Sequence, residues 1–214
     1  MVKVGFIVEG ETEKLLIDSD VFQTLLMDLQ LECVSEAIDA RGNGNLLPHN
    51  IIPFRETLKD KGAEHIIILT DKDDDACITL TRQRVSEREN QMIIVAVKKI
   101  EAWFLADSQT MSCLLKEDYV FENPEQENVP YDTISALIYD KTGRGIGGSK
   151  PKFAKNILRK GFSLTRAAAH PNCPSATYFL NKLTQTSPQP AAADCPEGGL
   201  KQKTPPSGAG GLLL

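Results

Sequence analysis

The sequence lacks the features that would place the protein in a membrane or in an oxidising compartment. No apolar run in its 214 residues approaches the roughly 18–20 residues that cross a bilayer. The N-terminus passes from a strand-length apolar stretch directly into charged residues, without a small-residue cleavage site. The five cysteines are odd in number and never spaced as C-x-x-C, which argues against a disulfide framework. These absences predict a cytoplasmic protein with free thiols and no membrane partner.

Basic residues are fewer than acidic ones, and they are unevenly distributed along the chain. The chain has 24 Lys and Arg against 29 Asp and Glu, a formal net charge of −5. Even so, the stretch from Lys141 to Arg166 contains basic residues and no acidic ones. A basic stretch beside an acidic body suits a protein that holds metal ions in one place and phosphates next to it.

Apolar strands alternate with amphipathic helices over the first half of the chain. This pattern predicts an α/β fold with a mainly parallel sheet that helices flank on both faces. The strands are expected at residues 2–8, 31–38, 65–70 and 92–97. The helices are expected at residues 11–30, 47–61, 76–89 and 175–184.

The composition divides the chain into three parts. Residues 1–110 carry the strand and helix pattern of an α/β metal-binding core. Residues 111–185 are expected to form a small helical and basic C-terminal extension. Residues 186–214 are rich in Pro, Ala, Gly and Ser without hydrophobic periodicity, which predicts a disordered low-complexity tail.

Two of the three strongest strands run directly into carboxylates. Glu9 follows the first strand, with Glu13 one helical turn later, and Asp71 and Asp73 follow the strand at 65–70. The carboxyl ends of parallel strands meet at one edge of a sheet, where ligands bind. Asp71 and Asp73 would point to the same side if the strand continues. Such hard oxygen ligands suit Mg²⁺ or Mn²⁺. The alternative interpretation of each carboxylate is a solvated loop residue without a function.

An EF-hand calcium loop is excluded by two details. Asp71, Asp73 and Asp75 fit the first three ligand positions, but Ala76 stands where the loop needs glycine. Arg82 occupies the last position, where the loop needs glutamate. The aspartates therefore require another interpretation.

Three motifs in this order resemble a known domain. They are V-E-G in residues 6–10, D-x-D at Asp71 and Asp73, and I-E-A-W-F-L-A-D at residues 100–107. Together they resemble the Toprim domain, the metal-binding module of topoisomerases, bacterial primases and OLD-family nucleases. The resemblance covers residues 1–110 and is closest to small stand-alone Toprim-like and OLD-nuclease-like proteins of bacterial defence and mobile-element loci. One departure is Asp74-Asp75-Ala76, where topoisomerases and primases usually have a glycine.

The resemblance implies roles for particular carboxylates. Glu9, Asp71 and Asp73 would be catalytic residues and metal ligands, and Glu13 would serve a second ion. Glu101 would be a further metal ligand, although a carboxylate favoured by the helix dipole at a helix start explains it equally well. We interpret Trp103 as a core residue rather than a stacking platform.

The basic segment contains a candidate phosphate site. After the Gly-rich residues 142–148, Ser149 is a plausible N-cap and Pro151 suits a first helical turn. Exposed amides at a helix start bind phosphate. OLD-like nucleases place a lysine at the scissile phosphate, so Lys150 or Lys152 is the catalytic candidate; the alternative is a solvated helix face. The predicted nucleic-acid contacts are Arg144, Lys150, Lys152, Lys155 and Arg159.

The sequence therefore predicts a Mg²⁺- or Mn²⁺-dependent, nuclease-like phosphodiesterase that acts on DNA or RNA, in bacterial (phage) defence or mobile-element biology. The chain has no P-loop, so an ATP-driven step would need a separately encoded ATPase; a homodimer is also compatible. The alternative is a non-catalytic metal- or nucleic-acid-binding subunit that regulates such an ATPase. Hydrolysis of a small phosphorylated molecule is a third possibility.

Overall fold

A parallel sheet forms the centre of the molecule. The computed structural model describes residues 1–146 and 148–188. The sheet is five-stranded with the order β2-β1-β4-β5, and β3 pairs with the far end of β1. All of these pairings are parallel, which confirms the predicted fold class. The strands are β1 (Val2–Val8), β2 (Leu31–Cys33), β3 (Ile38–Asp39), β4 (His65–Asp71) and β5 (Gln91–Ala96).

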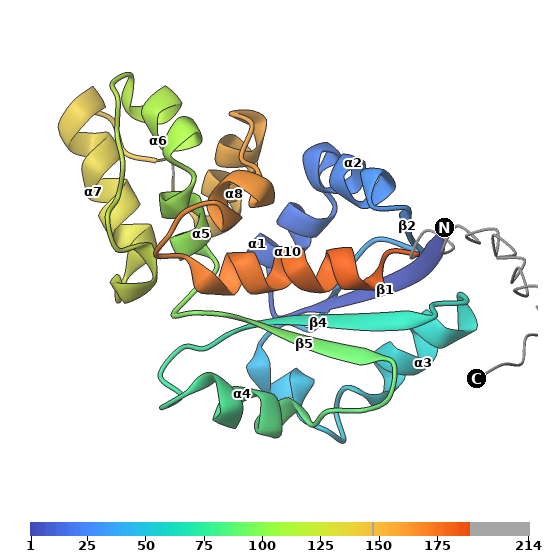
Figure 1. Cartoon of the computed structure of the whole chain (residues 1–214). Coiled ribbons are helices and arrows are strands. Elements are labelled where there is room, and N and C mark those ends of the chain that lie inside the picture. The colour runs from blue at the N-terminus through green and yellow to red at the C-terminus, as the bar shows by residue number, and fades with distance from the viewer. Residues whose placement is uncertain (147, 189–214) are drawn as a thin grey trace, which may run out of the picture.

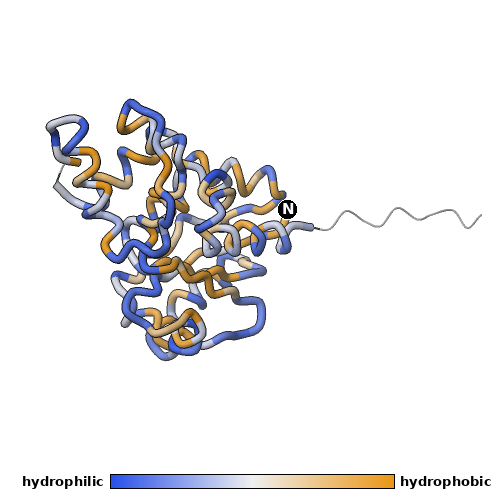
Figure 2. Tube along the Cα trace, turned by 60° about the vertical axis from the view of Figure 1, so that its left-hand side comes forward, coloured by the Kyte–Doolittle hydropathy of each residue, from blue (hydrophilic) through white to orange (hydrophobic). Residues whose placement is uncertain are grey.

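Alternate side chains of the central strands enter two separate cores. Phe6 and Leu69 belong to one buried cluster, whereas Ile7 and Ile68 belong to the other. Because helices cover both faces, the strands are apolar at nearly every position rather than at every second one. Figure 2 shows the strands as hydrophobic along most of their length, with hydrophilic loops at the periphery.

Helices cover both faces of the sheet. On one face lie α3 (Ile52–Asp60) and α4 (Ile78–Val85), below the sheet in Figure 1. The larger cluster, on the other face, runs without interruption from β1 to the last helix. Its helices next to the strands are α1 (Glu11–Ile17), α2 (Asp20–Asp28), α5 (Glu101–Ala106) and α10 (Pro174–Thr186). It continues into α6 (Ser108–Leu115), α7 (Pro130–Thr142), α8 (Lys150–Arg159) and α9 (Leu164–Ala168).

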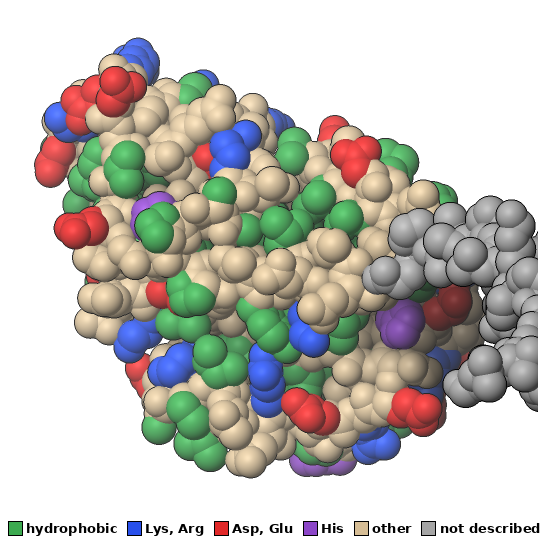
Figure 3. All heavy atoms as spheres, viewed as in Figure 1, with side chains coloured by type: hydrophobic (Ala, Val, Ile, Leu, Met, Phe, Trp, Pro, Cys, Tyr) green, Lys and Arg blue, Asp and Glu red, His purple; other side chains and the backbone are tan. Residues whose placement is uncertain are grey.

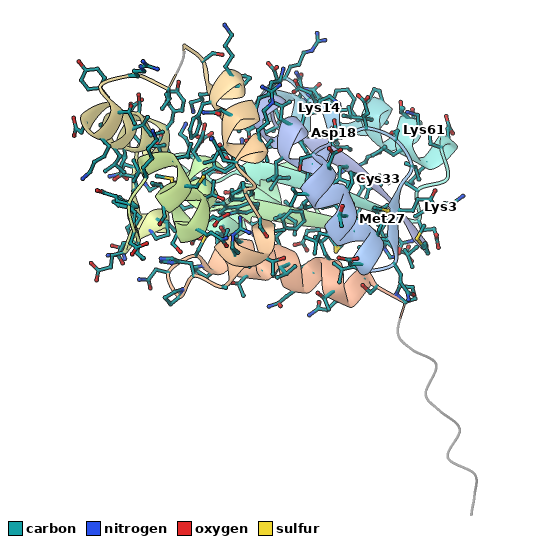
Figure 4. All side chains as sticks on the ribbon, turned by 90° about the horizontal axis from the view of Figure 1, so that it is seen from above. Lys3, Lys14, Asp18, Met27, Cys33 and Lys61 are labelled. Atoms are coloured by element: carbon teal, nitrogen blue, oxygen red, sulfur yellow. The ribbon has the colours of Figure 1, made fainter. Side chains whose placement is uncertain are left out.

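The helix predicted over residues 11–30 is wrong in one respect, because it is broken into α1 and α2. Ser19 caps α2 by accepting a hydrogen bond from the N–H of Phe22. Asp18 accepts the N–H of Ala37 and pairs with Lys14 at 2.6 Å (Figure 4). Such side-chain bonds to the backbone compete with continuation of a helix.

Other predicted boundaries shift by a few residues. The weak strand at 31–38 is divided into β2 and β3, which both pair with β1. The helix expected at 47–61 begins only at Ile52, with Pro53 in its first turn and the 3₁₀ turn Asn43–Leu46 before it. The helix expected at 76–89 is shorter, as α4.

Helix α5 anchors the C-terminal helices to the sheet. Trp103 is fully buried, and its indole N–H donates to the Ser175 hydroxyl at 2.7 Å, in keeping with its predicted core role. Asp107 is also fully buried and pairs with Arg166 at 2.8 Å. The short 3₁₀ turn Pro124–Gln126 contributes Glu125, which accepts the backbone N–H of Ser175. Polar contacts of Trp103 and Asp107 thus anchor α5 to residues that are distant in sequence.

The last described residues follow α10. Ser187 follows α10 and donates its hydroxyl hydrogen to the carbonyl of Leu29. Most of the tail that we predicted to be disordered, residues 189–214, lies outside the described residues. Within residues 1–146 and 148–188, no helix is long and apolar enough to cross a membrane.

Close approach of α3 to β1 generates a first prediction. A Cβ atom at Gly5 would lie 2.8 Å from Cδ2 of the fully buried Leu58. Gly5→Val should therefore lower the free energy of unfolding by about 1–3 kcal/mol, because the added side chain overpacks this contact. Urea unfolding measures the loss. The same change should cost less when Leu58→Ala has removed the clashing atoms. Fully additive losses in the double variant would contradict this account.

Candidate functional site

An acidic hollow lies at the carboxyl edge of the sheet. Its volume is about 420 Å³, and it brings together all five carboxylates that the sequence predicted as metal ligands. The parallel register puts the ends of β1, β4 and β5 at this edge. The predicted residues in its lining are Glu9, Glu13, Asp71, Asp73, Glu101 and Lys150. The lining also includes Gly10, Glu11, Thr12, Asp39, Arg41, Gly42, Lys99 and Pro151.

Glu9 is held in place by the neighbouring strand. Its Oε2 accepts the hydroxyl hydrogen of Thr70 at 2.6 Å and the backbone N–H of Asp71 at 3.1 Å. Both donors come from the end of β4, so the β1–β4 pairing determines where this carboxylate lies. Oε2 thus accepts two hydrogen bonds from the protein, whereas Oε1 has no hydrogen-bond partner among the described residues.

Gly10 makes room for the second glutamate. It is the extended N-cap of α1, and Glu13 lies in the first turn of that helix. A Cβ atom at Gly10 would lie 3.3 Å from Oε2 of Glu13. The glycine of the V-E-G motif therefore permits a close approach between the Glu13 carboxylate and the strand-to-helix turn.

Asp71 and Asp73 reach the hollow by a different route from the one we predicted. Asp71 ends β4, and its Oδ1 accepts the N–H of Ile100 at 2.9 Å. The strand does not continue, because Asp73 has a left-handed φ of +47° and its N–H donates to the carbonyl of Lys98. Its carboxylate pairs with Lys99 at 3.0 Å. The expected extended D-x-D is wrong, although both side chains line the hollow.

Glu101 fits both of its alternatives. It is the first residue of α5, which is a favourable place for a carboxylate, and it also lines the acidic hollow. Its side chain is 2% exposed, and Oε1 pairs with Lys150 at 3.1 Å. Oε2 is buried without a hydrogen-bond partner among the described residues. A buried carboxylate oxygen without a partner is costly, and a cation would relieve that cost.

The crowding of negative charge shifts the ionisation of two carboxylates. Burial raises the pKa of Asp71 well above its usual value, and Glu13, Glu9, Glu101 and Asp73 raise it further. Burial likewise raises the pKa of Glu13 to about 7; Glu101 and Glu9 add to this effect and Lys150 opposes it. The seven carboxylates in the lining thus outnumber its three cations, Arg41, Lys99 and Lys150.

The donor chemistry of the hollow fits a hard divalent cation. The oxygens are carboxylates, and one of them is buried without a partner. As the side chains stand, no three His, Cys, Asp or Glu residues within the described part of the chain form a group that could hold a metal ion. A cation here would therefore be completed by water or substrate oxygens, as Mg²⁺ usually is. The five-residue ligand set stays a prediction.

The basic segment contributes one lysine to the hollow. Ser149 is the N-cap of α8, although its side chain makes no capping hydrogen bond, and Lys150 begins the helix. Phe153, Ala154 and Ile157 face the core, so the rest of the helix turns its basic residues outward. The predicted residues that are exposed and outside the lining are Arg144, Lys152, Lys155 and Arg159. The structure therefore favours Lys150 over Lys152.

Several polar and charged residues of the site were not found from the sequence. Thr70 and Lys99 bond directly to the carboxylates of Glu9 and Asp73. Asp39 and Arg41 enter from the end of β3. Lys99 directly precedes the I-E-A-W motif, and this position was the one signal in the sequence that could have identified it. Thr70, Asp39 and Arg41 reach the site through strand pairing, which the sequence does not show.

The raised pKa of Glu13 predicts a pH-dependent gain on substitution. Because the folded protein holds this proton more tightly than the unfolded chain, stability is fully present below pH 4.5 and is lost as pH rises through about 7. In chelator-treated protein, Glu13→Gln should therefore stabilise by about 1–3 kcal/mol above that range and much less below 4.5. Urea unfolding on both sides of the range measures this effect. The exposed Glu11→Gln is the matched control, and an equal gain at both pH values would refute the prediction.

Comparisons with known proteins give one similarity. No family model matches the chain, and no curated protein matches its sequence. Among solved structures, the chain is similar to the C-terminal region of the Burkholderia pseudomallei OLD protein, with a TM-score of 0.42 and 14% identity. The similarity covers 86% of this chain and 99% of that one. At these values it carries no assignment of fold or function, so the resemblance to the Toprim and OLD families rests on the sequence motifs.

Proposed function

We propose that the acidic hollow binds Mg²⁺ or Mn²⁺ and cleaves phosphodiester bonds in nucleic acid. The observation that carries the proposal is the crowding of carboxylates at one sheet edge, with Glu101 Oε2 buried and unpaired. The raised pKa values of Asp71 and Glu13 have the same cause. The Toprim-like motifs support the same reaction class, in a bacterial defence or mobile-element setting.

The protein's own contacts suit Glu9 and Asp71 to be the inner ligands. Each has one oxygen held by donors from the backbone or from Thr70. That anchoring orients the carboxylate while the second oxygen stays available, which lowers the cost of organising a site. Asp73, Glu13 and Glu101 would complete the outer positions. Bound cations would activate water and neutralise charge on the scissile phosphate.

Two lysines would act as countercharges that a cation displaces. Lys99 pairs with Asp73 and Lys150 pairs with Glu101, so each neutralises one proposed ligand. The Lys150 side chain is 44% exposed, which leaves it free to move away from Glu101. Once displaced, its ammonium group would lie beside the hollow, where it would neutralise charge that develops on the phosphate.

The exposed face of α8 would hold the nucleic acid next to the hollow. Lys152, Lys155 and Arg159 are exposed on the helix whose first residues line the hollow, and Arg144 precedes it. Contacts of this kind bind backbone phosphates without reading sequence, and they weaken with added salt. DNA and RNA are both compatible with such contacts.

A second candidate function is a non-catalytic subunit that binds metal or nucleic acid and regulates a partner ATPase. The observation in its favour is that Lys99 and Lys150 already neutralise two of the five carboxylates. In that case the acidic hollow would bind a metal ion without cleaving nucleic acid, or would be a structural ion-pair cluster in a subunit that binds nucleic acid elsewhere. Cleavage assays separate the two candidates.

Asp71→Asn should remove cleavage. The change keeps the shape of the side chain but removes a charged oxygen ligand, so activity on DNA and RNA oligonucleotides with Mn²⁺ should fall on the order of 100-fold or more. Asp74→Asn is the matched control, because Asp74 is exposed and outside the lining. Cleavage that is undiminished in Asp71→Asn rejects the proposal, and wild type that binds Mn²⁺ without cleaving supports the regulatory subunit.

Lys150 and Lys152 should have separable effects. Lys150→Ala should lower the cleavage rate by roughly 10²-fold, because it removes a charge beside the reacting phosphate. Lys152→Ala should leave the cleavage rate of bound substrate unchanged. It should reduce the slope of log binding constant against log salt concentration by about one. Single-turnover rates and binding at several salt concentrations measure both effects. Equal losses of rate in the two variants would contradict the assignment.

A further inference from the structure

A second hollow lies at the opposite ends of the strands. Its volume is about 420 Å³, and it is bounded by the end of α3, the start of β4 and the segment that leads from α4 into β5 (Figure 1). Ile66 in its wall and Asp71 in the acidic hollow are five residues apart on β4, roughly 16 Å at about 3.3 Å per residue. We call it the arginine pocket; its lining is Arg55, Lys59, Ala63, Glu64, Ile66, Arg88, Glu89, Asn90 and Gln91.

Arg55 is buried in the wall of this pocket without a countercharge. Its residue is 6% exposed, and one guanidinium nitrogen, Nη2, donates to the carbonyl of Ser86 at 3.4 Å. Its Nε and Nη1 are buried and have no hydrogen-bond partner among the described residues. No ion pair in residues 1–146 and 148–188 includes Arg55. A buried, unpaired guanidinium is costly unless a ligand completes it.

A second arginine faces the same space. Burial lowers the pKa of Arg55, and the nearby positive charge of Arg88 lowers it further. Lys59 adds a third cation to the lining. The lining also contains two carboxylates, Glu64 and Glu89, and no ion pair among the described residues joins either of them to Arg55, Lys59 or Arg88. Three cations against two carboxylates leave the lining with a net positive charge, which favours an anionic ligand.

The pocket also presents an unpaired acceptor. The side-chain amide of Gln91 donates to the carbonyl of Ser86 at 2.9 Å, and its Oε1 is buried without a partner in the part of the chain that the structure describes. The same carbonyl accepts from Arg55, so one backbone group holds both side chains in the wall. A ligand that satisfies the pocket therefore needs an anionic group for the arginines and a hydroxyl or amino donor for Gln91.

We infer that the arginine pocket binds a small phosphate monoester that carries hydroxyl groups, such as a nucleoside or sugar monophosphate. The volume falls in the range of small-molecule sites. Paired guanidinium groups match phosphate oxygens, and they bind them better than a single ammonium does. This site is separate from the acidic hollow and does not depend on the proposed cleavage activity.

A polynucleotide is the less suitable ligand for this pocket. On the face seen in Figure 3, charges of both signs are interspersed around the region where α3 and α4 lie, rather than forming a continuous basic track. A polynucleotide needs such a track along its backbone.

The test is calorimetric binding of inorganic phosphate, AMP and adenosine to the whole protein. AMP should bind more tightly than phosphate, and adenosine should not bind. Arg55→Met should abolish binding without destabilising the unliganded protein, because it removes an uncompensated buried charge. Arg88→Ala should weaken AMP binding by roughly tenfold or more. Lys61→Ala is the matched control: Lys61 lies at the end of α3 but outside the lining (Figure 4).

Several outcomes would overturn the inference. They are the absence of AMP binding at millimolar concentration, equal binding of adenosine, and AMP binding that neither arginine substitution changes. Binding of a single-stranded oligonucleotide that depends on Arg55 and that AMP does not displace would also overturn it. Arg88 is exposed, so Arg88→Ala keeps the test valid if Arg55→Met fails to fold. Asp71→Asn should leave AMP binding unchanged, which separates this site from the proposed function.

Discussion

The hydrogen bond from the backbone N–H of Asp71 to the Glu9 carboxylate ties the acidic hollow to the sheet. It exists because β1 and β4 pair in parallel with a register that puts Val8 beside Leu69. Two residues that are 62 positions apart thereby share one edge, and the Thr70 hydroxyl reinforces the contact. A shift of one residue in that register would carry these groups to the wrong faces and separate them.

The negative charges at this edge oppose stability. Burial and mutual repulsion disfavour the ionised forms of Asp71 and Glu13, and Lys99 and Lys150 relieve only part of the repulsion. The arginine pocket shows the same physics with the opposite sign, because Arg55 is buried beside Arg88. Groups with strongly perturbed pKa values cluster at functional sites, although structural ion-pair networks also contain them. The sheet therefore separates an anionic hollow at one end from a cationic pocket at the other.

The C-terminal helices are part of the same hydrophobic core as the sheet. Phe179 of α10 stacks near Phe22 and Trp103, and Asp107 holds Arg166 in a buried ion pair. These contacts set the position of α5, whose first residue is Glu101, and α8 packs against α1 beside it. Lys150 therefore meets Glu101 because two helices far apart in sequence are seated on one core. The basic segment thus contributes to the acidic hollow through packing and not through its net charge.

The sequence by itself determined the parallel α/β class and the carboxylates that follow its strands. Both depend on local patterns: apolar runs of strand length, and acidic residues at their ends. Only the tertiary structure decided that Asp73 turns left-handed onto Lys99, that Lys150 and not Lys152 reaches the hollow, and that Arg55 is buried. Those outcomes depend on backbone hydrogen bonds and side-chain packing between segments distant in sequence. The spacing of residues in the sequence does not predict such contacts, because burial and pairing are properties of the folded chain as a whole.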